Sequence, residues 1–267
     1  MSKIPKPISN YVERFLIQYK DLKIENIELD EFSELIIQEK SQINNMLMSG
    51  LGASTLILRL SAVINLSIKL EEGSDEEDTL LMKQILDNIR EVLPSDTNWK
   101  NILKITSDNQ SLWYKCVNAE GSNSSIMDRF VTFRNKFVHE IILLKPDHAK
   151  KVLNGINVLK SICLEVAPIF ENSEFKETEG KYYFIQKTGL FKSKKICLYP
   201  FVQPGEEDDL PYIFQGLYDN KTTAELISTF YGDVEEQKGS EHYDLVFNPI
   251  IESLKGGAGK VFDHSDR

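Results

Sequence analysis

Cysteine is scarce in this chain of 267 residues, which contains only three. Cys116, Cys163 and Cys197 lie far apart and form no pair with the two-residue spacing of zinc or redox sites. Neither a structural zinc site nor a disulfide framework is therefore expected. Thiols this few and this scattered fit a reducing compartment, and we expect a cytoplasmic protein.

The sequence also shows neither the pattern of a signal peptide nor that of a membrane-spanning helix. The first ten residues contain two prolines and no apolar run, unlike a signal peptide. The most apolar window, Leu51 to Leu70, contains Arg59 and Lys69, which a membrane-spanning helix would have to bury. We expect no association with a membrane.

Motifs for bound metals and phosphates are each incomplete. The glycine-rich run 256–260 is not a phosphate-binding loop, because Leu254 and Val261 replace its first glycine and its hydroxyl residue. His139 and Glu140 begin the H-E-x-x-H pattern of zinc proteases, but Leu143 stands where the second histidine is needed. The acidic run 71–78 lacks the alternating spacing of a calcium loop. We therefore expect no metal and no cofactor.

Acidic residues outnumber basic ones by 41 to 31, which gives a formal net charge of -10. A chain with this charge does not coat nucleic acid non-specifically, because affinity for phosphate depends on clustered Lys and Arg. Basic residues do cluster locally. The stretch 129–160 contains seven Lys or Arg against two acids, and 181–203 contains five Lys and no acid. Any nucleic-acid site must be local.

Apolar residues at steps of three and four predict a helical bundle over residues 1–172. A helix beginning at Asp30 should be interrupted at Gly50 and Gly52, and the following segment, Ser54 to Leu70, is apolar on nearly all sides, as in a helix inside a bundle. Other helices are expected from Ser9–Asn10 (a short one), over Thr79–Leu93, from Asp96 or Thr97, and from Pro146.

The pattern changes after residue 180, where aromatic and β-branched residues alternate with turn residues. We expect a small β-rich domain over 180–247 and a short helix with a flexible tail over 248–267. Its basic hairpin fits two interpretations: an aromatic core packed on the bundle, which we favour, or a surface that stacks single-stranded RNA. The residues concerned are Tyr182, Tyr183, Phe184, Phe191, Lys192, Lys194 and Lys195.

The stretch 128–144 combines an apolar helical stripe with a polar trio. At about 100° per residue, His139 lies roughly 200° from Phe137, with Asn135 one turn earlier and Arg134 at the edge of the stripe. We expect the stripe to be buried and the trio to be exposed. The stripe consists of Phe130, Phe133, Phe137, Ile141 and Leu144.

Residues 134–139, Arg-Asn-Lys-Phe-Val-His, resemble the R-x4-6-H motif of the HEPN superfamily of helical-bundle ribonucleases, including the polar residue after the arginine. The resemblance covers roughly residues 1–172. It implies a mainly α fold, with a HEPN-type bundle followed here by the β-rich domain. It also implies a metal-independent endoribonuclease of a prokaryotic defence or toxin system, with two motifs lining one cleft of a homodimer and a 2′,3′-cyclic phosphate as product.

Metal-free RNA cleavage needs a group that takes the proton of the 2′-hydroxyl and a cation that stabilises the charge developing at phosphorus. His139 and Arg134 are suited to these roles, and Asn135 can orient the imidazole or bind phosphate. The predicted partners are RNA, a second copy of the chain and a regulatory or antitoxin protein. The predicted RNA-binding residues are Arg129, Lys136, Lys150 and Lys151.

The same residues leave a second class of function open. The chain can be a catalytically silent HEPN-like module for dimerisation or sensing, whose β-rich domain binds a protein or nucleic-acid partner. In that case Arg134 is an ordinary surface residue, paired with Asp128 or Glu140, and His139 takes no part in chemistry.

Overall fold

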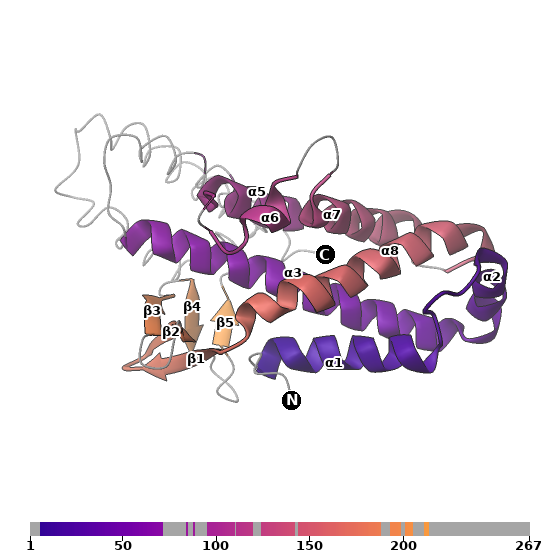
Figure 1. Ribbon diagram of the computed structural model, residues 1–267, viewed down its shortest axis with the longest axis horizontal. Helices are drawn as coiled ribbons and strands as arrows, with labels where there is room; N and C mark the ends of the chain where they lie inside the picture. Colours follow the sequence, from indigo (N-terminus) through magenta and orange to yellow (C-terminus); the bar gives the residue numbers. More distant parts are fainter. Residues whose placement is uncertain are drawn as a thin grey trace, which may run out of the picture.

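The computed structural model describes residues 6–71, 84, 88, 95–109, 111–119, 124–141, 144–187, 193–198, 201–204 and 211–213. Helices pack around one long central helix, α3, and a small antiparallel sheet lies at one end of the bundle (Figure 1). The expectation of a mainly α protein with a β-rich C-terminal region is confirmed at this level.

The chain begins with three helices, α1 (Lys6–Asp21), α2 (Leu29–Gln38) and α3 (Lys40–Glu71). Helix α1 begins before the expected cap at Ser9–Asn10 and is 16 residues long, so the expectation of a short helix was wrong. Glu28 rather than Asp30 occupies the N-cap of α2, and Asp30 lies in the first turn, where its charge complements the helix dipole.

Helix α3 runs through Gly50 and Gly52 without a break, so the predicted interruption was wrong. Tertiary packing explains why. A Cβ atom at Gly50 would lie 2.7 Å from Cδ2 of Phe15 in α1 and 2.9 Å from Cδ1 of Leu159 in α8 (Ala149–Ser161), and one at Gly52 would lie 3.0 Å from Cε1 of Tyr11. The glycines let neighbouring helices approach α3 closely, and that contact outweighs the cost of about 1 kcal/mol for a glycine inside a helix.

The second half of the bundle begins with α5 (Asp96–Thr106), which a capping box of Ser95 and Asn98 starts, followed by the single turn α6 (Tyr114–Val117). Helix α7 (Ile126–Lys136) continues into a π-helical turn (Phe137–Ile141). A 3-10 turn (Pro146–His148) then leads into α8 (Ala149–Ser161), which ends in a π-helical turn (Ile162–Val166) and a 3-10 turn (Ala167–Phe170). The predicted starts at Asp96 and Pro146 are confirmed. The helix predicted over 79–93 falls outside the described residues, except for Gln84 and Asn88.

Helix α3 lies at the centre and contacts α1, α2, α5, α7 and α8. By length and composition, Lys40–Lys69 and Pro146–Phe170 could each cross a membrane, but 67% of the most apolar window of the first is buried inside the protein. Burial of this kind is typical of the core helix of a bundle. The largest fully buried side chains of the core include Phe15, Phe32, Trp99, Trp113, Phe130 and Phe170.

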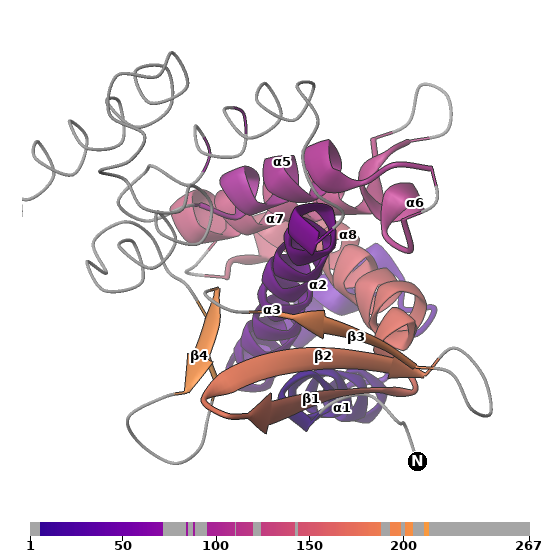
Figure 2. The ribbon, with the colours of Figure 1, turned by 90° about the vertical axis from the view of Figure 1, so that its left-hand side faces the viewer.

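The sheet at the end of the bundle contains β1 (Ser173–Thr178), β2 (Lys181–Lys187) and β3 (Ser193–Cys197) in that order, all antiparallel (Figure 2). A turn at Glu179 and Gly180, with φ of 55° and 75°, joins β1 to β2. Two positive φ angles are the signature of a tight hairpin turn, which glycine favours. Strand β1 lies entirely in the stretch between the two predicted domains. A second pair consists of β4 (Val202–Pro204) and β5 (Pro211–Ile213).

The sheet and the bundle share one core. The ring of Phe184 in β2 lies 6.2 Å from that of Phe170, which lies 5.9 Å from the ring of Trp113. Tyr182 is also buried, so these two hairpin aromatics pack inward rather than stack on RNA. Tyr183 faces outward beneath Lys195, whose Nζ lies 3.8 Å from the ring centroid. Phe191 and Lys192 fall outside the described residues, as does everything beyond residue 213.

Candidate functional site

Helix α7 is anchored at both ends. Its N-cap is Ser125, whose hydroxyl accepts a hydrogen bond of 3.1 Å from the backbone N–H of Asp128. After the π-helical turn, Leu144 closes the segment with a positive φ of 38° and donates its N–H to the carbonyl of Ile141 at 2.7 Å. The predicted apolar stripe is confirmed: all five of its side chains are buried, namely Phe130, Phe133, Phe137, Ile141 and Leu144.

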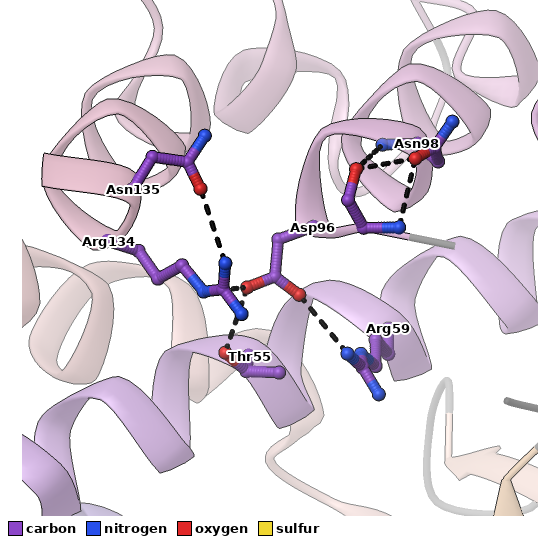
Figure 3. Close-up of polar contacts among 7 residues, drawn as sticks. Thr55, Arg59, Asp96, Asn98, Arg134 and Asn135 are labelled. Atoms are coloured by element: carbon purple, nitrogen blue, oxygen red, sulfur yellow. Dashed lines mark hydrogen bonds and ion pairs between the residues drawn. The ribbon is translucent and has the colours of Figure 1, made fainter. Parts of the chain in front are cut away.

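Arg134 turns toward the interior of the bundle and meets Asp96, the first residue of α5. Its Nε lies 3.3 Å from Oδ2 of Asp96, and its Nη1 donates to Oδ1 of Asn135 at 3.3 Å (Figure 3). The arginine side chain keeps 36% of its surface exposed, whereas that of Asp96 keeps 1%. The buried carboxylate of Asp96 therefore fixes the guanidinium on its inner side, while the outer edge of the guanidinium stays accessible to solvent.

Asp96 is shared between three helices. Its second oxygen, Oδ1, pairs with Nη2 of Arg59 at 3.4 Å, and Thr55 donates its hydroxyl to Oδ2 at 3.3 Å. Thr55 and Arg59 lie one turn apart on α3, so the carboxylate of α5 ties α3 to α7 (Figure 3). A buried acid is tolerated when cations and donors surround it, and its oxygens here face two arginines and one hydroxyl.

The partners that the sequence suggested for Arg134 were wrong. Asp128 pairs instead with Nζ of Lys100 at 2.6 Å, and Glu140 pairs with Nζ of Lys151 at 3.2 Å. Burial alone would raise the pKa of Asp128, but the hydrogen bonds from Lys100 and Ser125 outweigh it and lower the pKa below its usual value. Asp96 was not identified as a site residue. The only sequence signal for it is an acid just inside the start of a helix, and that signal is common.

Asn135 holds Arg134 rather than the histidine. Its side-chain oxygen accepts the hydrogen bond from Arg134, which leaves its NH2 group for another partner. His139 is exposed, and its imidazole makes no hydrogen bond or ion pair within the described part of the chain. It lies in the π-helical turn beside Val138, which is also exposed. Turns of this kind often occur at functional sites, because the extra residue changes the direction of the side chains that follow.

The four predicted RNA-binding residues are all exposed but do not form one group. Arg129 and Lys136 on α7 and Lys151 on α8 line a cavity of about 520 Å³ between the two helices. Lys150 is exposed on α8 and does not line it. Two asparagines of α8 that we did not predict, Asn154 and Asn157, complete its polar rim.

The other reactive side chains near the bundle are poorly suited to chemistry. Burial raises the pKa of the Cys163 thiol to about 12. Burial, helped by the negative charge of Glu165, raises the pKa of Cys116 to about 11. Both thiols are therefore protonated and weakly nucleophilic near neutral pH.

No family model, curated protein or solved structure matches this chain. The resemblance to HEPN ribonucleases therefore depends on residues 134–139 and on the helical bundle around them.

Proposed function

We propose that the chain is a metal-independent endoribonuclease of the HEPN type, with His139 and Arg134 as its catalytic residues and Asn135 as a positioning residue. One observation supports this most. Within six residues of one helix, a guanidinium fixed by a buried carboxylate and still open to solvent is followed by an exposed imidazole that has no partner in the described part of the chain. Such an arrangement favours chemistry on a phosphate at the surface.

In the proposed reaction, the 2′-hydroxyl of a nucleotide loses its proton to His139, and its oxygen attacks the neighbouring phosphorus. The bond from phosphorus to the 5′-oxygen breaks, which leaves a 2′,3′-cyclic phosphate, and a general acid protonates the departing oxygen. The guanidinium of Arg134 donates to the phosphate oxygens, where negative charge develops. Asp96 and Asn135 hold this guanidinium in place, so that little reorganisation is needed in the transition state.

The reaction also requires a second copy of the chain. The attacking and departing oxygens lie on opposite sides of phosphorus, so the base and the acid must approach from opposite sides. One motif supplies a single histidine, and a symmetric dimer with the His139 faces near the two-fold axis supplies the other. We propose that this dimer acts in the cytoplasm, which the few scattered cysteines favour. The family resemblance implies a prokaryotic defence or toxin system controlled by a regulatory or antitoxin protein.

The alternative, a catalytically silent dimerisation or sensing module, is favoured by a different observation. The ion pair between Arg134 and Asp96 also serves the fold, because it joins α7 to α5 and, through Arg59, to α3. If Arg134 serves only the fold, the histidine five residues later has no catalytic role.

Cleavage of mixed RNA in excess chelator separates the two functions. We expect the wild-type protein to leave 2′,3′-cyclic phosphate ends and His139→Ala to cleave about 10² to 10⁴ times more slowly. The melting temperature of His139→Ala should equal that of the wild-type protein, because His139 is exposed. Val138→Ala, at the exposed neighbouring position, is the control and should retain activity. A folded His139→Ala protein that cuts at the wild-type rate would exclude catalysis by this motif.

A further inference from the structure

A groove runs between α7 and α8, two helices that lie side by side in Figure 1. Its volume is about 520 Å³, within the range of roughly 300 to 1,000 Å³ that is usual for small-ligand pockets. Its floor contains the ring of Phe133, which packs directly over Gly155. The absence of a side chain at Gly155 therefore gives the ring its place.

The charge of the groove has one sign. Arg129, Lys136 and Lys151 line it, and among the described residues no Asp or Glu does. Lys151 does form an ion pair with Glu140 outside the groove, but both side chains are more than half exposed. Exposed pairs of this kind contribute little, so Lys151 can exchange Glu140 for a stronger anionic partner. In a protein with a net charge of -10, such a local excess of cations needs an explanation.

The spacing of the cations indicates the size of the anion. Arg129 and Lys136 are seven residues apart on α7, or about 10 Å along the helix axis. A spacing of this size lets the two side chains contact two neighbouring phosphates of one strand, one phosphate each. Asn154 and Asn157 add amide groups that both donate and accept hydrogen bonds, as ribose hydroxyls and base edges require.

From this geometry we propose that the groove between α7 and α8 binds a short stretch of single-stranded polynucleotide, with at least two phosphates on Arg129, Lys136 and Lys151 and the sugars or bases beside Asn154 and Asn157. The site is distinct from Arg134, which points toward Asp96 and α5. The inference rests on the proposed function only in taking the strand to be RNA. Lys150 lies outside the groove and is expected to contribute less than its neighbour.

Binding can be measured apart from cleavage, with a fluorescent 2′-O-methyl hexanucleotide that lacks the attacking hydroxyl. Anisotropy between 50 and 200 mM salt should give a slope of log affinity against log salt between about -1.4 and -2.1, or about 0.7 for each of the two or three phosphates that the cations contact. Lys151→Gln should weaken binding roughly three- to tenfold and flatten the slope by about 0.7. The double variant Asn154→Asp with Asn157→Asp keeps the side-chain shapes, adds negative charge to the groove and should weaken binding further.

Lys104→Gln is the matched control, because it makes the same charge change at an exposed position on α5. It should change the affinity less than twofold, and Lys150→Gln should weaken binding less than Lys151→Gln does. Equal effects of the Lys104, Lys150 and Lys151 variants would overturn the proposal, because they would indicate a diffuse charge effect. Adenosine monophosphate that competes as well as an unlabelled hexanucleotide would overturn the assignment to a strand.

The experiments distinguish failure of the groove proposal from failure of the proposed function. A wild-type protein that binds the hexanucleotide through the groove but does not cleave RNA supports the groove and contradicts the proposed function. A protein that cleaves RNA, and whose groove variants bind the hexanucleotide like wild type, contradicts the groove alone.

Discussion

The two sides of helix α7 both carry cations, but in the part of the chain that the structure describes only one side has an acid buried beneath it. On the side facing α3 and α5, Arg134 is held by Asp96, which is almost completely buried. On the side facing α8, Arg129 and Lys136 line a groove that contains no acid among the described residues. The first arrangement fixes a cation in one geometry. The second leaves cations unneutralised, which costs some repulsion but keeps them ready for a phosphate ligand.

Removing the buried acid should give the largest effect. Asp96→Asn keeps the shape of the side chain but leaves Arg59 and Arg134 without their shared partner. We expect the free energy of unfolding to fall by about 2 to 3 kcal/mol, less than for a fully buried pair, because both guanidiniums can turn to water. Urea denaturation measures this loss. On the proposed function, cleavage should also slow about tenfold in protein that is still folded.

Glu25→Gln is the control for Asp96→Asn. Glu25 pairs with Lys160 at 3.3 Å and is largely exposed, so the free energy of unfolding should change by less than about 0.5 kcal/mol. Equal destabilisation by the two variants would show that Asp96 stabilises the fold no more than an exposed acid does.

A methyl group at Gly155 should disturb the other side of α7. It would overlap the ring of Phe133, which is buried and packed against Phe137 with ring centroids 5.9 Å apart. Overpacking costs about 1 to 3 kcal/mol, here about 2 to 3 because the overlap with the ring is severe, and the better helix propensity of alanine returns about 1 kcal/mol. Gly155→Ala should therefore lower the free energy of unfolding by about 1 to 2 kcal/mol and weaken hexanucleotide binding. A variant as stable as wild type would show that the ring of Phe133 has another place to go.

The start of α7 should respond to pH. The pKa of Asp128 is lowered in the folded protein, so its contribution to stability is present above the pKa of the unfolded chain, about 3.9, and is lost as pH falls through the folded value. Its side chain is 35% exposed, and solvent screening limits the contribution to about 0.5 kcal/mol. Asp128→Asn should be less stable than wild type at pH 7 and should approach it near pH 3. A difference that grows on acidification would contradict this assignment.

The smallest change in stability is expected in the groove. The double variant Arg129→Gln with Lys136→Gln removes two like charges that no acid among the described residues pairs with, so the free energy of unfolding should stay within about 0.3 kcal/mol or rise slightly. Binding of single-stranded RNA should nevertheless weaken, with the salt slope flattened by about 1.4. Calorimetry on this variant tests the expected stability, and anisotropy on the same sample tests the expected loss of RNA affinity. A marked fall in melting temperature would mean that these residues serve the fold.

The sequence predicted those features of α7 that depend on local order. The stripe from Phe130 to Leu144 was predictable because helical spacing alone places its members on one face. The pairing of Arg134 with Asp96 was not, because 38 residues separate them and only the packing of α5 against α7 brings them together. The continuity of α3 through Gly50 and Gly52 was missed for a related reason. Glycine in a sequence predicts a helix break, and only the structure shows the neighbouring side chains that pack against these two positions.

The residues of the groove were predictable in part. Arg129 and Lys136 were predicted from the local excess of basic residues, and the helical spacing of Lys151 and Asn154 already places them on one face of α8. The sequence did not indicate which face of α8 meets α7. For that reason Lys150 was assigned to the same group as Lys151, although the structure places it outside the groove.

Helix α3 has a consequence for the order in which the protein is made. Its apolar surface is covered partly by α8, and Gly50 fits against Leu159 only after that helix exists. Almost 80 residues separate the end of α3 from the start of α8, so at about 5 to 20 residues per second the ribosome leaves this surface uncovered for roughly 4 to 16 s. We expect nascent chains stalled before residue 149 to bind chaperones and to be cut by protease within α3. Chains extended past residue 170 and clear of the ribosome should resist both.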